Sequence, residues 1–150
     1  MSELVSVLVP AYNAQRSLAQ TLRSALAQTW PRLEIIVVDD GSTDSTLEIA
    51  RRTGSARVCV LTQDNAGAAA ARNAALKSAQ GSYIQFLDAD DLLAPDKIST
   101  QLKGAGAGER SRLLLTGRWG RFHRDPAGAR FDRSCLWQDL APTEWLHRKL

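Results

Sequence analysis

The sequence has few of the residues that build cysteine-based or membrane-spanning proteins. Its two cysteines, Cys59 and Cys135, form no CxxC pair, which argues against a disulfide scaffold and a zinc site. No apolar run approaches the roughly 20 residues of a membrane-spanning helix. The N-terminus lacks a basic leader followed by a long apolar stretch, so no secretory signal is expected. These absences favour a cytoplasmic location, including the inner face of the cytoplasmic membrane. Cys59 lies in the apolar run Val58 to Leu61 and is expected to be buried.

Charge is ordinary in amount but uneven along the 150 residues, of which 44% are hydrophobic, enough for one globular core. Residues 1–102 carry 9 Lys and Arg against 11 Asp and Glu, whereas residues 103–150 carry 10 against 5. The basic segment could face an anionic membrane, as in peripheral membrane association, or an acidic substrate, or it could be an ordinary basic surface. The arginines form no compact run, so the ordinary surface is favoured and no nucleic-acid partner is expected. Nothing in the sequence indicates an oligomeric state.

Apolar patterning predicts alternating strands and helices over the first hundred residues. The expected helices include one with Leu18 and Leu22 on one face and another capped by Ser42 or Thr43. Expected strands cover 5–9, 33–38, 58–61 and 83–87, and two further helices cover 66–79 and 95–103. Such alternation predicts an α/β fold with a Rossmann-like, mostly parallel sheet flanked by helices. Weaker patterns suggest a fifth strand at 112–116 and a helix starting near 142–146.

Polar clusters follow three of the predicted strands. They are Pro10-Ala11-Tyr12-Asn13, Asp39-Asp40-Gly41-Ser42 and Asp88-Ala89-Asp90-Asp91. Because ligands of open parallel sheets bind outside the carboxyl ends of the strands, these clusters are expected to form one binding site.

The acidic cluster brings three carboxylates, Asp88, Asp90 and Asp91, into four residues. Such crowding is repulsive unless a cation or a basic residue compensates it. Carboxylate oxygens suit Mg²⁺ or Mn²⁺, which often keep only one or two protein carboxylates beside phosphates and water. The alternative is an acidic loop that caps the following helix.

The other polar residues each allow two interpretations. Asp39 and Asp40 can accept from a base N–H or a ribose hydroxyl, or build the turn with Gly41. Tyr12 can stack on a nucleobase or simply pack, while Asn13 can cap the first helix. Arg72, in an alanine-rich helix, can pair with the aspartates or a phosphate, or face solvent.

Four ordered motifs resemble the family 2 glycosyltransferases, which have the GT-A fold. They are Val7 to Asn13, Ile36 to Asp44, Asn65-Ala66-Gly67 with Ala71-Arg72-Asn73, and Gly81 to Asp91. The resemblance implies a nucleotide-sugar donor, commonly a UDP-sugar, and a divalent cation, Mn²⁺ or Mg²⁺. It places the base beside Pro10, Ala11, Tyr12, Asp39 and Asp40, and the pyrophosphate or base near Arg72. Asp88 would reach the ribose or metal, and Asp90 would bind the metal with Asp91 close by.

The resemblance also implies inverting transfer to a carbohydrate or lipid-linked acceptor, with an Asp or Glu as general base. No matching acidic pair is found before Leu150, and Asp139 is only a superficial candidate. We therefore expect residues 1–103 to be the nucleotide-sugar-binding half. Residues 104–150 are expected to begin an incomplete acceptor-side half, with the base beyond Leu150. The competing interpretation is a donor-binding module without turnover.

Other phosphate-handling α/β proteins fit less well. A nucleotidyltransferase usually has a glycine-rich loop after the first strand, where this chain has Pro10 to Asn13. A receiver-like domain would need an acidic pair after the first strand. A dinucleotide site would need GxGxxG there, and neither feature is present.

Overall fold

The computed structural model describes residues 2–53, 55–104, 115, 117–122 and 125–131. They belong to two compact units, Met1–Ser99 and Thr100–Leu150. Strands and helices alternate along the first unit, and the last helix begins in it. The elements are β1 (Val5–Ala11), α1 (Leu18–Leu26), β2 (Leu33–Asp40), α2 (Thr46–Arg52), β3 (Val58–Gln63), α3 (Ala68–Ser78), β4 (Tyr83–Phe86) and α4 (Lys97–Gly104).

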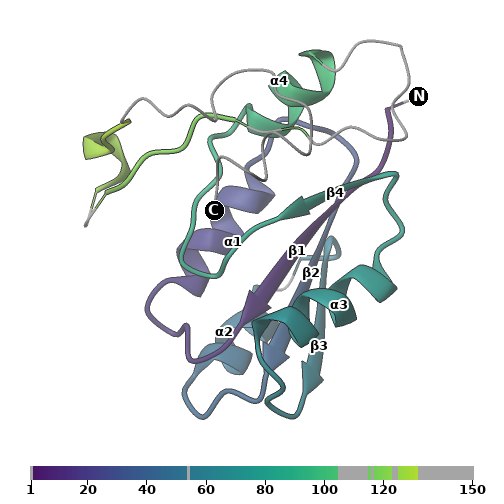
Figure 1. Cartoon of the computed structure of the whole chain (residues 1–150), viewed down its shortest axis with the longest axis vertical. Coiled ribbons are helices and arrows are strands. Elements are labelled where there is room, and N and C mark those ends of the chain that lie inside the picture. The colour runs from purple at the N-terminus through teal and green to yellow at the C-terminus, as the bar shows by residue number, and fades with distance from the viewer. Residues whose placement is uncertain (1, 54, 105–114, 116, 123–124, 132–150) are drawn as a thin grey trace, which may run out of the picture. The chain divides into compact units, whose positions relative to one another are not determined.

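The described strands form one parallel sheet in the order β3-β2-β1-β4. The connections from β1 through β3 move in one direction across the sheet, whereas the connection to β4 moves back. Because such crossovers are right-handed, α1 and α2 cover one face and α3 covers the other (Figure 1). The direction reverses between β1 and β4, so a ligand crevice is expected where these two strands end.

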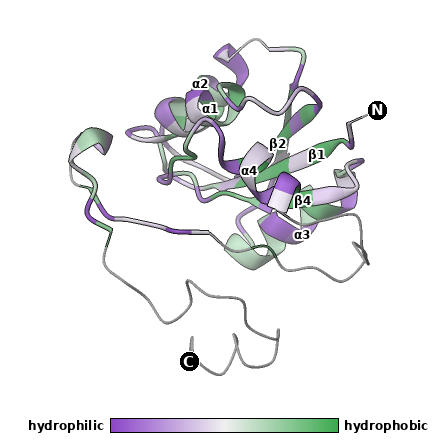
Figure 2. Ribbon diagram, turned by 90° about the horizontal axis from the view of Figure 1, so that it is seen from above, coloured by the Kyte–Doolittle hydropathy of each residue, from purple (hydrophilic) through white to green (hydrophobic). Residues whose placement is uncertain are grey.

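The core of the first unit lies on both faces of the central strands. All residues of β1 are buried, and those of β2 are buried except Glu34. On one face Leu8, Ile36 and Val38 pack against Ala71 and Ala75 of α3. Figure 2 shows β1 and β2 coloured mainly hydrophobic, while the helices mix hydrophobic and hydrophilic residues. Strands covered on both faces explain the near-continuous apolar runs in the sequence.

Several boundaries differ from the sequence-based expectation. The first strand continues through Pro10 to Ala11 because its pairing with β4 stops at Leu8. Beyond that point only β2 pairs with β1, so the missing N–H of proline is tolerated.

Two side-chain expectations were also wrong. Neither Ser42 nor Thr43 caps α2, which begins at Thr46, where Asp44 Oδ1 accepts from the Thr46 N–H at 2.9 Å. Cys59 is exposed rather than buried, because β3 is an edge strand of the described sheet and its Cys59 position lacks cover.

In the second unit the structure describes a short hairpin-like segment. Arg121 and Arg130 form an antiparallel bridge around the 3-10 helix Pro126–Gly128. Asp125 Oδ1 caps that helix by accepting from the Ala127 N–H at 2.9 Å. Apart from Leu115, which is not in a strand, the predicted strand at 112–116 lies outside the described residues, as does the helix near 142–146.

The α/β fold with a parallel sheet flanked by helices is confirmed. None of the helices in the described part of the chain has the length and apolar character needed to cross a bilayer.

Candidate functional site

A pocket of about 490 Å³ lies at the carboxyl ends of β1 and β4, where the connections reverse direction. Its volume falls in the range of small-molecule sites. Nine of the eleven residues predicted to bind donor or metal line it. They are Pro10, Ala11, Tyr12, Asn13, Asp40, Arg72, Asp88, Ala89 and Asp90. Asp39 and Asp91 are outside this lining. Chain segments almost eighty residues apart therefore converge as the strand-end pattern predicted.

The loop after β1 is held against the loop after β2 by reciprocal hydrogen bonds. The Asn13 N–H donates to Ser42 Oγ at 3.0 Å, and Asn13 Oδ1 accepts from the Thr43 N–H at 2.9 Å. Asn13 adopts a positive φ of 47°, which asparagine tolerates better than most residues. Asn13 therefore joins the two loops and does not cap α1, contrary to expectation. This junction leaves the Tyr12 side chain 52% exposed at the pocket.

Asp40 organises the loop that leads into α3. Its Oδ1 accepts from Gln63 Nε2 at 2.6 Å and from the Ala66 N–H at 2.9 Å, while Oδ2 accepts from the Gly67 N–H at 2.8 Å. The hydrogen bond from Ala66 is the largest of the effects that lower the pKa of Asp40, and burial opposes it. The side chain is 2% exposed and stays ionised because three donors compensate its desolvation.

Asp39 is buried with spare hydrogen-bonding capacity. One oxygen, Oδ2, accepts from the Ser42 N–H at 3.3 Å. The other, Oδ1, is buried and has no hydrogen-bond partner among the residues that the structure describes. A buried carboxylate oxygen without a donor is costly, so it is a candidate acceptor for a ligand N–H.

The wall opposite these loops carries an ion pair between α3 and the acidic loop, which we define as residues 88–96 between β4 and α4. Arg72 Nη2 lies 2.5 Å from Asp88 Oδ1. The two side chains are 37% and 52% exposed, so the pair contributes little to folding. Arg72 is therefore paired with a strand-end aspartate and remains accessible to an anion in the pocket.

Negative charge is concentrated in the acidic loop. Burial, then the charges of Asp90 and Asp88, raise the pKa of Asp91. Neither Asp90 nor Asp91 has a side-chain partner within the part of the chain that the structure covers. Their hard oxygen donors suit Mg²⁺ or Mn²⁺.

The same described residues contain no cluster of three or more His, Cys, Asp or Glu arranged to hold a metal ion. Mg²⁺ usually takes only one or two carboxylates, with ligand phosphates completing its shell, so Asp90 and Asp91 fit a cation that arrives with a pyrophosphate.

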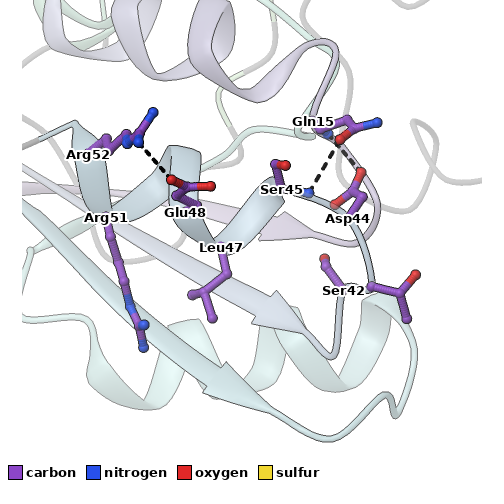
Figure 3. Close-up of a pocket in the computed structure, with 9 residues that line it drawn as sticks. Gln15, Ser42, Asp44, Ser45, Leu47, Glu48, Arg51 and Arg52 are labelled. Carbon is purple, nitrogen blue, oxygen red and sulfur yellow. Dashed lines mark hydrogen bonds and ion pairs between the residues drawn. The ribbon is translucent and has the colours of Figure 1, made fainter.

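A larger hollow of about 700 Å³ lies beside α2 (Figure 3). Its polar side chains already bond one another: Arg52 pairs with Glu48 at 2.7 Å, and Gln15 bonds Ser45 and Asp44. Arg51 extends away from that pair. Most of its polar groups bond one another, and few of the residues predicted from the sequence line it, so the smaller pocket is the better site.

Sequence reasoning did not assign some residues that line the pocket. They are Ala14, Ser17, Asn65, Gly67, Ala68 and Ala71. The motif Asn65-Ala66-Gly67 was the available signal, because a glycine before an alanine-rich helix marks a close backbone approach. The candidate base Asp139 lies outside the described residues.

The fold is an α/β domain with a pocket at the carboxyl ends of its strands, and it is the GT-A fold of glycosyltransferases. The model of the family described as "Glycosyl transferase family 2" matches residues 6–123. The chain therefore belongs to glycosyl transferase family 2, which confirms the resemblance read from its motifs.

Known proteins agree with this placement. The chain is 46% identical over 101 residues to the Escherichia coli UDP-Glc:alpha-D-GlcNAc-diphosphoundecaprenol beta-1,3-glucosyltransferase WfaP, covering 67% of the chain and 40% of that relative. The S. aureus TarS 1-349 structure in complex with UDP matches with a TM-score of 0.63 and 32% identity, covering 67% of the chain and 31% of TarS.

The Pyrobaculum calidifontis mannosyltransferase PcManGT, in complex with GDP-Man and Mn²⁺, matches with a TM-score of 0.64 and 33% identity. That match covers 69% of the chain and 32% of PcManGT. The chain thus spans about two fifths of the length of the curated relative.

Proposed function

We propose that the pocket at the carboxyl ends of β1 and β4 binds a nucleoside-diphosphate sugar, most simply a UDP-sugar, together with Mn²⁺ or Mg²⁺. The observation that carries the proposal is the convergence of nine predicted residues on one pocket, with Arg72, Asp88 and Asp90 among them. The solved neighbours with UDP and with GDP-Man and Mn²⁺ support this ligand class.

Different residues of the pocket suit different chemical groups of the ligand. The exposed Tyr12 ring offers a stacking surface for the base, flanked by the Pro10-Ala11 backbone. Asp39 Oδ1 offers an acceptor for a base N–H, since both oxygens of Asp40 already accept protein donors. Arg72 can exchange Asp88 for a diphosphate oxygen, which frees Asp88 for a ribose hydroxyl or the cation.

Asp90, with Asp91 and Asp88 close by, would hold the cation. A bound divalent cation would neutralise the charge that develops on the departing nucleoside diphosphate. The chain's own residues position the donor, so that its anomeric carbon faces the side from which an acceptor approaches.

For the whole protein we propose inverting transfer to a carbohydrate or lipid-linked acceptor. An acceptor hydroxyl attacks the anomeric carbon, a carboxylate takes its proton, and the nucleoside diphosphate leaves. The name of the E. coli relative, which specifies a diphosphoundecaprenol-linked acceptor, supports the lipid-linked class. Because the chain spans 40% of that relative, donor binding is proposed for the chain and transfer for the protein as a whole.

Binding and turnover can be separated in one experiment. The 150-residue chain is incubated with Mn²⁺ and UDP-glucose, GDP-mannose or UDP alone, with and without a sugar acceptor, and both bound nucleotide and nucleotide released from the sugar donors are measured. We expect saturable binding of the UDP compounds with little release. Rapid release with a sugar acceptor would place the general base within the chain, and absence of any nucleotide binding would contradict the proposal.

A further inference from the structure

The buried side of α1 and of the two residues after it carries three polar residues beside the apolar stripe of the helix. Thr21 is fully buried, Gln28 is 6% exposed, and Ser24 is half-buried. Thr21 and Ser24 lie three residues apart on one side of α1, next to the core residues Leu18 and Leu22, and Gln28 follows two residues after the helix ends. Burying polar groups on a core-facing helix is unfavourable unless hydrogen bonds compensate, so the partners of these groups are informative.

These side chains have partners in the chain that follows β4. Thr21 Oγ1 donates to the Ala89 carbonyl at 2.9 Å, and Ser24 Oγ accepts from the Leu93 N–H at 3.1 Å. Gln28 bonds twice: its Nε2 donates to the Ala94 carbonyl at 2.7 Å, and its Oε1 accepts from the Ile98 N–H at 3.2 Å.

The acidic loop has no regular secondary structure to satisfy its backbone, so side chains of α1 and Gln28 just after the helix supply hydrogen bonds to it. The Leu87 N–H donates to the Leu8 carbonyl at 3.0 Å and ends the pairing with β1. From Ala89 onward the backbone bonds to Thr21 and Ser24 of α1 and to Gln28 just after it. The Thr29 N–H also donates to the Pro95 carbonyl at 2.8 Å, and in a turn the Asp91 N–H donates to the Asp88 carbonyl at 3.0 Å. Hydrogen bonds thus fix the backbone of the loop, while Asp90 is exposed and lines the pocket.

We infer that Thr21, Ser24 and Gln28 form a positioning stripe that orders the acidic loop, so that its carboxylates are in place before donor and cation bind. Thr21 is the critical member because Ala89 lies between Asp88 and Asp90 and itself lines the pocket. This inference rests on the proposed function. Holding the backbone in advance reduces the ordering cost of binding, which would otherwise weaken affinity.

The test compares Thr21→Val, which keeps the side-chain shape and removes the hydroxyl, with Thr21→Ser, which keeps the hydroxyl. The matched control is Ser6→Ala. Ser6 is also a fully buried hydroxyl with two hydrogen bonds, to Glu34 and from the Gly81 N–H, but it lies at the opposite end of β1. For each variant the dissociation constant of Mn²⁺-dependent UDP binding and the amide hydrogen exchange of residues 88–91 are measured.

We expect Thr21→Val to weaken Mn²⁺-dependent UDP binding about tenfold, as loss of a group that orients metal ligands commonly does. The Asp91 amide should lose exchange protection. Thr21→Ser should restore both properties, and Ser6→Ala should lower the melting temperature without changing either. A purely structural role for Thr21 predicts instead that Thr21→Val behaves like Ser6→Ala.

Each other outcome is decisive. Unchanged affinity and exchange in folded Thr21→Val overturn the inference, as does a Thr21→Ser variant as impaired as Thr21→Val. If Thr21→Val does not fold, Ser24→Ala replaces it, and normal exchange at residues 91–94 there overturns the stripe. If wild-type chain binds no nucleotide, the proposed function fails, and the exchange measurement alone decides whether α1 orders the loop.

Discussion

Asp39 and Asp40 are adjacent residues whose side chains lie on opposite faces of β2, because side chains alternate along a strand. Asp40 accepts three hydrogen bonds from the segment that leads into α3. Asp39 accepts one from the turn and keeps a buried oxygen without a partner in the described residues. Asp40 therefore builds the pocket wall, and Asp39 keeps a buried oxygen that we propose accepts from the ligand.

This division predicts that the same substitution affects mainly stability at Asp40 and mainly ligand binding at Asp39. Asp40→Asn should lower the free energy of unfolding by about 2 kcal/mol, because it weakens hydrogen bonds to a charged acceptor. Asp39→Asn should change stability by less than about 1 kcal/mol, since only one long hydrogen bond is affected, and should weaken UDP binding. Urea denaturation and calorimetry check the two parts, and equal stability losses would contradict the assignment.

The contribution of Asp40 should also depend on pH. Its pKa in the folded chain lies below the unfolded value of about 3.9, chiefly because the Ala66 N–H stabilises the ionised form. Its stabilisation is therefore complete above the unfolded pKa and is lost as pH falls through the folded pKa. The stability difference between wild type and Asp40→Asn should be constant from about pH 5 to 7 and shrink below about pH 4. A difference that grows on acidification would contradict the assignment.

For single residues, the sequence predicted which side chains lie at the strand ends better than it predicted their hydrogen-bond partners. The strand-end position of Asp40 was readable from the apolar run before it. Its donors, Ala66 and Gly67, lie 26 and 27 residues away, and no local pattern indicates that approach. Asn13 was expected to cap a helix and instead bonds a loop 30 residues distant, for the same reason.

Among the elements, the turn after β2 depends on a close backbone approach. Gly41 has a φ of 71°, and a Cβ there would meet the Asn65 backbone nitrogen at 2.8 Å. Gly67, before α3, also has a positive φ, of 89°, but a Cβ there would meet nothing within 4 Å. Both positions carry strain for a side chain, and only Gly41 also carries a clash.

The two glycines therefore form a matched pair for mutation. Gly67→Ala should cost about 1 kcal/mol through backbone strain alone, and Gly41→Ala about 2–3 kcal/mol through strain and the contact with Asn65. Chemical denaturation of both variants measures the difference. A smaller loss for Gly41→Ala than for Gly67→Ala would show that the loops do not approach as described.

The periodicity of apolar residues predicted the type and order of the helices and strands, but it did not predict where they begin and end. The predicted cap of α2 at Ser42 or Thr43 failed because both groups bond Asn13, so Asp44 takes the helix start. The first strand continues past Pro10 because its pairing with β4 ends at Leu8. The sequence of a strand does not show how long its partner strand is. Caps and ends were decided by tertiary contacts.

For the whole molecule, we expect the nucleotide and the cation to stabilise the folded state together. Ligand at 100 times its dissociation constant adds about 2.7 kcal/mol to the folded state. This corresponds to a rise in melting temperature of roughly 10 °C for a chain of this size. UDP with Mn²⁺ should produce the shift, whereas UDP with excess chelator should produce much less. Equal shifts in melting temperature with and without Mn²⁺ would show that UDP binding does not require the cation.

If the acidic loop makes nucleotide binding depend on a divalent cation, calorimetric titration with UDP will show that dependence. Titrations with and without Mn²⁺ are run on wild type, Asp90→Ala and Asp64→Ala. Asp64 is an exposed aspartate outside the pocket lining, so its variant matches the charge change. We predict Mn²⁺-dependent binding in wild type and Asp64→Ala and its loss in Asp90→Ala. Unchanged Mn²⁺-dependent binding in Asp90→Ala would contradict the account.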